Sequence, residues 1–403
     1  MDAASDQTMF AHHRLSCVSA MLACLAFPAC RSSRLGPDPA PRQALEQAWR
    51  ARCQRLTTDL RRAGARSITV GGPGLPDPGP QRVLLTLLEH DDELQRFVLR
   101  DGRVRRLASR PLRPLQRLVI QTRDELEHGA LRPGFPRLAR LLARLHRQLL
   151  EGVPLRGARE LVVAPDGMSW LIPFHALVTR TGPAPRFLVE QTAVSYAACS
   201  CCSERHPDHA VVLAPRYGHD PRHLAAVPRE IAAVTRRFPR RTTVHQGDDA
   251  TETRLLQALA DPHALVHFAG HGLADLEPGS TPTLVLADNR PPNTLARLTR
   301  RPVAAELVVL AACTTAFPAR FRDDRLLWTR TSPVVGLLLS GADQVVGASW
   351  LVKDRLSAEQ MDLFYRQLDR GPAQAMRHSY RELIRRLTSP HPRLWAAYAL
   401  YRR

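Results

Sequence analysis

Short apolar segments alternate with helical segments from about residue 160 to the end of this sequence, and this alternation limits the folds that the chain can adopt. Strands are predicted at 161–164, 210–214, around His267, 283–287, 307–312 and 343–348, with helices at 228–237, 250–260, 332–340 and 357–368. Strands that are apolar along their whole length and separated by helices are typical of a mostly parallel sheet covered on both faces. The sequence therefore predicts an α/β fold.

The preceding part of the chain has a different organisation. A run rich in Pro and Gly at 71–80 cannot hold a helix or an internal strand, so a boundary is predicted there, after a helical stretch at 43–63. Beyond it, 83–88 and 94–99 are predicted to pair as strands, and two amphipathic helices are expected at 115–127 and 138–150.

The first 36 residues contain a short basic region before an apolar run at 15–27 and a cysteine at Cys30. This order resembles a bacterial lipoprotein signal, although Phe27 and Pro28 fit its cleavage site poorly. A disordered N-terminus is the alternative. We expect a cytoplasmic protein, with export and membrane attachment only if Cys30 is lipidated.

The chain is strongly basic, with 57 Lys and Arg against 38 Asp and Glu and a formal charge of +19. Lys353 is the only lysine, so the charge is almost entirely arginine and is spread over nearly every segment. Aromatic residues make up 5% of the chain and are not interleaved with basic clusters, which argues against a stacking surface for nucleic acid. We expect no nucleic acid partner.

The eight cysteines match neither a disulfide framework nor the paired CxxC spacing of a zinc site. No metal and no cofactor is expected. Cys313 ends an apolar strand, as His271 does 42 positions earlier.

His271 and Cys313 are predicted to lie together beyond the carboxyl ends of neighbouring parallel strands, where ligand crevices form in open α/β sheets. A nearby imidazole can generate the thiolate that attacks a carbonyl. Gly272 leaves its backbone N–H unobstructed, and with the N–H of Cys313 it could form an oxyanion hole. Spacing alone leaves the alternative open that Cys313 is a small buried residue and His271 is satisfied by backbone.

From about Leu84 onward the chain resembles the CHAT domain, a family of bacterial caspase-like cysteine peptidases related to separases, gingipains and caspases. The resemblance rests on separate stretches in the family's order: 161–167, 171–177, 187–190, 194–196, 226–230, 250–251, 267–272, 307–313, 341–343, 348–350 with Asp354, 364–365 and 391–397.

The resemblance implies a three-layer α/β/α caspase-like sandwich, with a degenerate first half at 81–225 and a catalytic half at 226–403. By position, His271 matches the family's general base and Cys313 its nucleophile, while His267 is expected to face the core or a neighbouring loop. The implied function is a cysteine endopeptidase acting on a protein substrate, under the control of another protein or of processing.

Three residues are weaker candidates for substrate binding. Trp350 and Asp354 are expected near the site, with packing as the alternative for this loop. Asp323 could bind a basic substrate residue, or it could pair locally with arginines. The family usually has an acidic residue after the nucleophile, where this chain has Thr314. That departure supports the alternative function, a catalytically silent scaffold for partner binding.

Overall fold

The computed structural model describes most of the chain from Ala40 to Arg403. The described residues are 40–62, 65, 67–68, 75, 78–199, 206–216, 224–273, 283–287, 295–317, 319–322, 325–328 and 332–403. The lipoprotein-like segment with Cys30, most of the Pro/Gly run at 71–80, and Asp323 lie outside them. Residues 40–403 form one compact unit.

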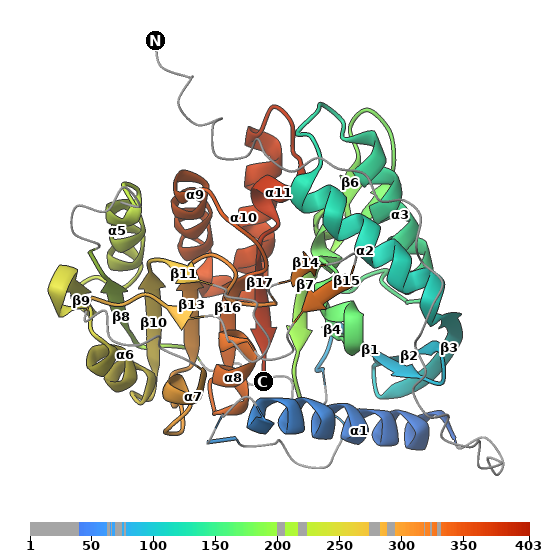
Figure 1. Ribbon diagram of the computed structural model, residues 1–403, viewed down its shortest axis with the longest axis horizontal. Helices are drawn as coiled ribbons and strands as arrows, with labels where there is room; N and C mark the ends of the chain where they lie inside the picture. The colour runs from blue at the N-terminus through green and yellow to red at the C-terminus, as the bar shows by residue number, and fades with distance from the viewer. Residues whose placement is uncertain are drawn as a thin grey trace. The chain divides into compact units, whose positions relative to one another are not determined.

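The strands and helices follow the predicted order with several additions (Figure 1). The strands are β1 Arg82–His90, β2 Glu93–Arg100, β3 Arg103–Pro111, β4 Glu160–Ala164, β5 Val178–Arg180, β6 Arg186–Phe187, β7 Ala193–Ala197, β8 His209–Ala214, β9 Thr242–Gln246, β10 Ala264–Ala269, β11 Gly272–Leu273, β12 Thr283–Leu284, β13 Leu307–Ala311, β14 Ala319–Arg322, β15 Arg325–Trp328, β16 Gln344–Ala348 and β17 Tyr398–Arg402. The helices are α1 Pro41–Arg62, α2 Leu112–His128, α3 Pro136–Leu150, α4 Leu188–Gln191, α5 Val227–Arg237, α6 Glu252–Leu259, α7 Leu295–Leu298, α8 Pro333–Leu339, α9 Asp354–Tyr365, α10 Pro372–Arg386 and α11 Pro392–Trp395.

One large sheet organises the unit, with strand order β3-β2-β1-β4-β7-β17-β16-β13-β10-β8-β9. Most neighbouring pairs are parallel, as predicted, and the antiparallel ones are β3-β2, β2-β1 and β16-β17. Figure 1 shows α5, α9 and α10 on one side of the central strands and α6, α7 and α8 on the other. Strands β4, β7, β10, β13, β16 and β17 are buried along their whole length, which explains their continuous apolar sequences.

The β16-β17 pair reverses the direction of the sheet. Strand β17 runs parallel to β7 but antiparallel to β16, so the strands on its two sides point in opposite directions. The carboxyl ends of β4 and β7 therefore lie at the edge opposite the carboxyl ends of β10 and β13. The carboxyl ends of β4 and β7 therefore do not contribute to a site at His271 and Cys313, whereas β8 runs parallel to β10 and ends at the same edge.

Helix α1 packs tightly against the sheet and is not part of a free linker. Arg52 is fully buried and donates hydrogen bonds to the carbonyls of Pro165 at 2.6 Å and Ala197 at 2.5 Å, and also to that of Ala198. Its guanidinium lies over the rings of Trp49 and Trp170, at 5.3 and 5.4 Å from their centroids. The buried charge is thereby paired with carbonyl oxygens at the carboxyl ends of β4 and β7.

The strand predicted at 283–287 is corrected by the structure. Only Thr283 and Leu284 form a strand, and they pair with β11 in a separate two-stranded sheet. Because β10 and β13 pair directly with each other, the large sheet has no position for a strand between them. The predicted boundary at residue 225 stays a prediction. Strand β8 precedes residue 225 in the chain, yet in the sheet it lies beside β10, which belongs to the second half.

Candidate active site

The register of β10 and β13 brings the backbones of His271 and Cys313 side by side. Ala269 pairs with Ala311 at the end of the ladder, and the N–H of Gly270 donates to the carbonyl of Ala311 at 3.3 Å. Continuing this parallel register by two residues places His271 opposite Cys313. Both side chains are half-buried, so they are neither sealed in the core nor fully in solvent.

Gly272 permits this close approach. A Cβ atom built at position 272 would lie 2.2 Å from the carbonyl oxygen of Cys313 and 3.3 Å from Cγ2 of Thr315. Any other residue at 272 would therefore push the His271 segment away from the Cys313 segment. Glycine is needed here for the space it leaves, and not for a left-handed backbone conformation.

The turn that carries Cys313 is held by hydrogen bonds to the end of β16. Thr315 is 1% exposed, and its Oγ1 atom accepts a hydrogen bond from the N–H of Ala348 at 3.0 Å. The N–H of Ala316 donates to the carbonyl of Ala348 at 2.9 Å. Thr314 has φ of 53°, in the left-handed region that β-branched residues rarely adopt. The residue after Cys313 is therefore strained, as is common at functional sites.

The thiol of Cys313 lies beneath the segment that follows β16. The N–H of Val352 points at Sγ with a separation of 3.3 Å, and Sγ lies 3.8 Å from the Val352 carbonyl. Burial raises the pKa of the Cys313 thiol, and the contact with the Val352 backbone offsets part of that rise. The thiol is thus mainly protonated at neutral pH, so it needs a base to become a nucleophile.

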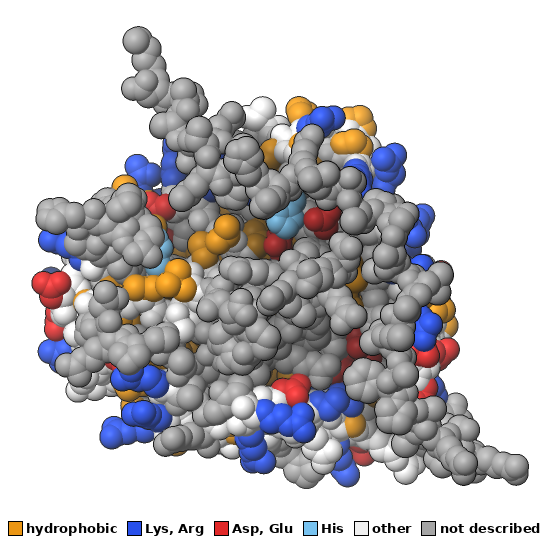
Figure 2. Space-filling view, in the orientation of Figure 1, with side chains coloured by type: hydrophobic (Ala, Val, Ile, Leu, Met, Phe, Trp, Pro, Cys, Tyr) orange, Lys and Arg blue, Asp and Glu red, His pale blue; other side chains and the backbone are white. Residues whose placement is uncertain are grey.

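Two exposed leucines flank the candidate pair. Leu273 follows Gly272 and is 47% exposed, and Leu351 precedes Val352 and is 68% exposed. Figure 2 shows hydrophobic side chains on the face above β10 and β11. Large apolar side chains exposed beside a reactive group are suited to contact an apolar ligand.

His267 faces the helices and not the candidate site, as predicted. It is fully buried, and its Nδ1 and Nε2 atoms lie 2.8 Å from the Tyr365 hydroxyl and 2.9 Å from Oε2 of Glu230. The Ser357 hydroxyl donates to Oε1 of Glu230 at 2.8 Å and lies 2.8 Å from the Tyr398 hydroxyl. This network links β10 and β17 to α5 and α9, so it positions the helices that pack behind the site.

The sequence prediction did not identify the partners in this network, which are Glu230, Ser357, Tyr365 and Tyr398. A histidine inside an apolar strand was the available signal, because a buried imidazole requires hydrogen-bond partners. Nothing in the sequence showed which residues would supply them.

The three weaker candidates have different surroundings. Trp350 is 4% exposed, its indole N–H donates to the carbonyl of Arg393 at 3.1 Å, and the guanidinium of Arg123 lies 5.2 Å from its ring. Asp354 begins α9, and its carboxylate accepts from the N–H of Ala226 at 2.8 Å. Asp323 is outside the described residues.

Two further features bear on what the chain can bind. Among the described residues, no group of three or more His, Cys, Asp or Glu side chains is placed to hold a metal ion. Within the same ranges, no helix is both long enough and apolar enough to cross a membrane. On the face shown in Figure 2, Lys and Arg side chains are distributed in separate groups around the rim.

Comparison with solved structures gives distant similarities. The Saccharomyces cerevisiae separase–securin complex aligns with 11% identity and a TM-score of 0.52, over 87% of this chain and 31% of the separase chain. This chain thus spans about a third of that one. Gingipain R, an Arg-specific cysteine proteinase, aligns with 11% identity and a TM-score of 0.43 over 66% of this chain and 67% of its own. The complex of the Porphyromonas gingivalis RgpB pro- and mature domains aligns with 10% identity and a TM-score of 0.44 over 72% of this chain and 75% of its own.

No curated protein matches the sequence. The family model of the CHAT domain matches residues 137–403, a region that begins later than the predicted start near Leu84. The matched region contains β10, β13, β16 and β17, together with both members of the candidate pair. With its caspase-like α/β fold, the chain belongs to the CHAT domain family.

Proposed function

We propose that this protein is a cysteine endopeptidase in which Cys313 is the nucleophile and His271 the general base. The observation that supports the proposal is the parallel register of β10 and β13, whose ladder ends with Ala269 opposite Ala311, two residues before His271 and Cys313. A half-buried thiol with a raised pKa requires a base to become a nucleophile, and His271 on the neighbouring segment is proposed as that base.

The proposed reaction has two steps. His271 takes the thiol proton as Sγ of Cys313 attacks the peptide carbonyl, forming the S–C bond and a tetrahedral oxyanion. The N–H groups of Gly272 and Cys313 stabilise that oxyanion. His271 then gives the proton to the leaving amine as the C–N bond breaks. Water, deprotonated by His271, hydrolyses the thioester, and the thiol is regenerated.

The substrate is proposed to be a protein chain bound across the edge that carries Leu273 and Leu351. Their exposed side chains favour an apolar residue close to the cleaved bond. Trp350 and Asp354 are proposed to contribute by holding the flanking segments in place, since both side chains contact protein groups.

A cleavage assay tests the proposal. Wild-type protein, Cys313→Ala and His271→Ala are incubated with a peptide library, and new N-termini are identified by mass spectrometry. Cys199→Ala is the matched cysteine control and His128→Ala the matched histidine control. We expect cleavage by wild type and both controls only. Equal background in all five proteins would contradict the enzyme proposal and favour the silent scaffold, for which Thr314 is the supporting feature.

We further propose that another protein controls the activity. In this structure the Val352 backbone contacts the Cys313 sulfur, which a substrate carbonyl has to reach, so a movement of 350–353 would favour attack. The separase in the similar solved structure is in complex with securin. Purified wild-type protein should then cleave more slowly alone than with its activating protein, but still above the background of Cys313→Ala. Full turnover without any added protein would contradict this proposal.

A cytoplasmic location is proposed, with lipid attachment at Cys30 as the alternative. Fractionation of expressing cells distinguishes them. A shortened protein in the membrane fraction that Cys30→Ser releases would establish the alternative, and full-length protein in the soluble fraction would exclude it.

A further inference from the structure

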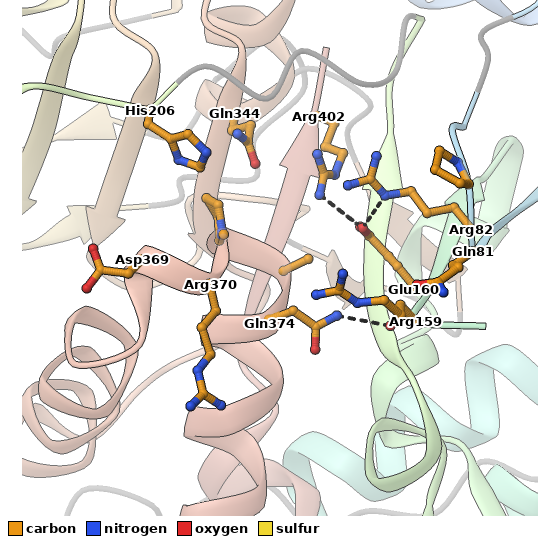
Figure 3. A pocket seen from close by; sticks show the side chains of 14 residues that line it. Gln81, Arg82, Arg159, Glu160, His206, Gln344, Asp369, Arg370, Gln374 and Arg402 are labelled. Atoms are coloured by element: carbon orange, nitrogen blue, oxygen red, sulfur yellow. Dashed lines mark hydrogen bonds and ion pairs between the residues drawn. The ribbon is translucent and has the colours of Figure 1, made fainter. Parts of the chain in front are cut away.

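A cavity of about 280 Å³ lies away from the candidate active site (Figure 3). Its lining includes Gln344 at the start of β16, Arg402 in β17, Arg82 and Glu160 at the starts of β1 and β4, and the first turn of α10. Cys313 lies near the opposite, carboxyl end of β16, because its sulfur contacts the backbone of Val352, which follows that strand. This volume is near the lower end of the range for small-molecule sites, which begins at roughly 300 Å³.

The cavity has a positive lining. Arg402 donates to both oxygens of Glu160 at 3.0 and 3.2 Å, and Arg82 donates to Oε2 at 3.0 Å, so two guanidinium groups share one buried carboxylate. Four arginines line the cavity against two carboxylates, Glu160 and Asp369, which leaves a charge of 4 − 2 = +2. The Arg159 side chain is exposed and makes no hydrogen bond or ion pair with a described residue. In Figure 3 it points towards the middle of the cavity.

The N-terminus of α10 opens into the same cavity. Its N-cap is Gly371, which has no side chain to cap the helix, and Pro372 follows it. The N–H of Ala375 donates to the carbonyl of Gly371 at 3.0 Å, which is the first hydrogen bond within the helix. The N–H groups of Ala373 and Gln374 have no acceptor within the helix, so they can bind another group. Backbone donors of this kind, together with the helix dipole, favour an anion.

Gln344 provides an independent observation. Gln344 is 2% exposed. Its Oε1 atom is buried, and no described residue forms a hydrogen bond with that atom. Buried side-chain amides are normally satisfied, so an unpartnered one facing a cavity indicates that a bound molecule supplies the partner. Figure 3 shows the amide directed into the space between His206 and Arg402. A carbonyl oxygen needs a donor, which a bare phosphate dianion lacks.

We infer that this cavity binds a small phosphate monoester that also carries a hydroxyl group. The phosphate lies at the N-terminus of α10, where the N–H groups of Ala373 and Gln374 and the guanidinium of Arg159 bind it. The hydroxyl donates to Oε1 of Gln344. The inference does not depend on the proposed peptidase function, because none of these residues belongs to the candidate active site.

Isothermal titration calorimetry on the full chain tests the inference with glycerol 3-phosphate, propyl phosphate and inorganic phosphate. We expect glycerol 3-phosphate to bind best. Arg159→Gln should weaken it about tenfold, the loss expected for one charge-assisted hydrogen bond. The matched control is Arg140→Gln, which removes an exposed arginine of α3 that does not line the cavity. This control should bind as wild type does.

Gln344→Met tests the hydroxyl contact separately, because it keeps the side-chain volume and removes the amide. It should bind glycerol 3-phosphate and propyl phosphate equally. Binding of neither ester by wild type would overturn the inference, as would an equal loss in Arg159→Gln and Arg140→Gln. Vesicles of phosphatidic acid and phosphatidylcholine distinguish a lipid-borne phosphate from a free one. Protein that sediments with these vesicles but binds neither free ester would also overturn it.

Discussion

Replacing Gly272 by alanine is the sharpest test of the geometry at the candidate active site. The new Cβ atom would lie 2.2 Å from the Cys313 carbonyl oxygen, whereas real Cβ atoms essentially never come within 3.0 Å of a neighbouring atom. The two segments must therefore separate by at least 3.0 − 2.2 = 0.8 Å. Because the backbone fixes the position of Cβ and the atom that it meets is a backbone oxygen, no side-chain rotation can relieve the clash.

The expected effect on catalysis follows from that displacement. A misplacement of about 1 Å between reacting groups can reduce the rate about 100-fold, which corresponds to ~2.7 kcal/mol of activation free energy. We therefore expect Gly272→Ala to lower kcat/KM for a cleaved peptide about 100-fold. The fold should persist, because the clash involves two chain segments beyond the ends of β10 and β13 and not the packed ladder itself.

The assay combines kcat/KM with thermal unfolding of the same preparation. Thr283→Ala is the matched control, because it alters the partner strand of Leu273 without approaching Cys313. An alanine variant with unchanged kcat/KM and unchanged Tm would refute the close approach of the two segments. A second measurement, the rate of Cys313 alkylation, reports on the same displacement without requiring a substrate.

Four other predictions concern the same half of the sheet. Alkylation of Cys313 by iodoacetamide should accelerate with rising pH beyond the ordinary cysteine pKa of about 8.5, because burial raises its pKa and only the thiolate reacts. Glu230→Ala should lower the free energy of unfolding by about 3 kcal/mol in urea titrations, because it leaves Nε2 of the buried His267 without its partner. Thr314→Asn should raise that free energy by about 1 kcal/mol, since asparagine tolerates a positive φ better. Leu351→Ser should lower kcat/KM about tenfold for peptides with an apolar residue at the cleavage site and leave other peptides unaffected, because it removes an exposed apolar contact.

Each of these predictions has a distinct contrary outcome. An alkylation rate that reaches its plateau below pH 8 would contradict the burial of the thiol. For the Glu230 network, the control is Glu382→Ala on the surface of α10; a similar change in both variants would remove the argument. Destabilisation by Thr314→Asn would show that the contacts of the threonine side chain stabilise the fold by more than its positive φ destabilises it. A uniform loss across all peptides for Leu351→Ser would point to a folding defect.

Local sequence patterns were sufficient to predict most of the strands and helices. Continuous apolar runs predicted β4, β8, β10, β13 and β16 because strands buried on both faces need apolar side chains on both faces. The same reasoning predicted that His271 and Cys313 would lie at the ends of parallel strands. It failed at 283–287, where an apolar run forms a two-residue strand outside the large sheet.

The parts that could not be predicted depend on contacts between residues far apart in the chain. Arg52 lies in what reads as an arginine-rich surface helix, yet it is fully buried and bonds carbonyls more than 100 positions away. Strand β17 inserts between β16 and β7, and no local pattern shows that it reverses the direction of the sheet. The cavity at Gln344 likewise exists only because β1, β4, β16, β17 and α10 meet there.

The sequence by itself determined the fold class and the family, and it led to the proposal of Cys313 and His271 as the reactive pair, because burial periodicity and reactive side chains are local properties. Only the tertiary structure decided that Gly272 has to be glycine, since the atom it would clash with belongs to Cys313 on another strand. It also decided what surrounds the two histidines of this segment. His267 and His271 are four residues apart on one segment, but the packing of α5 and α9 buries the first and leaves the second half-exposed beside the thiol's strand.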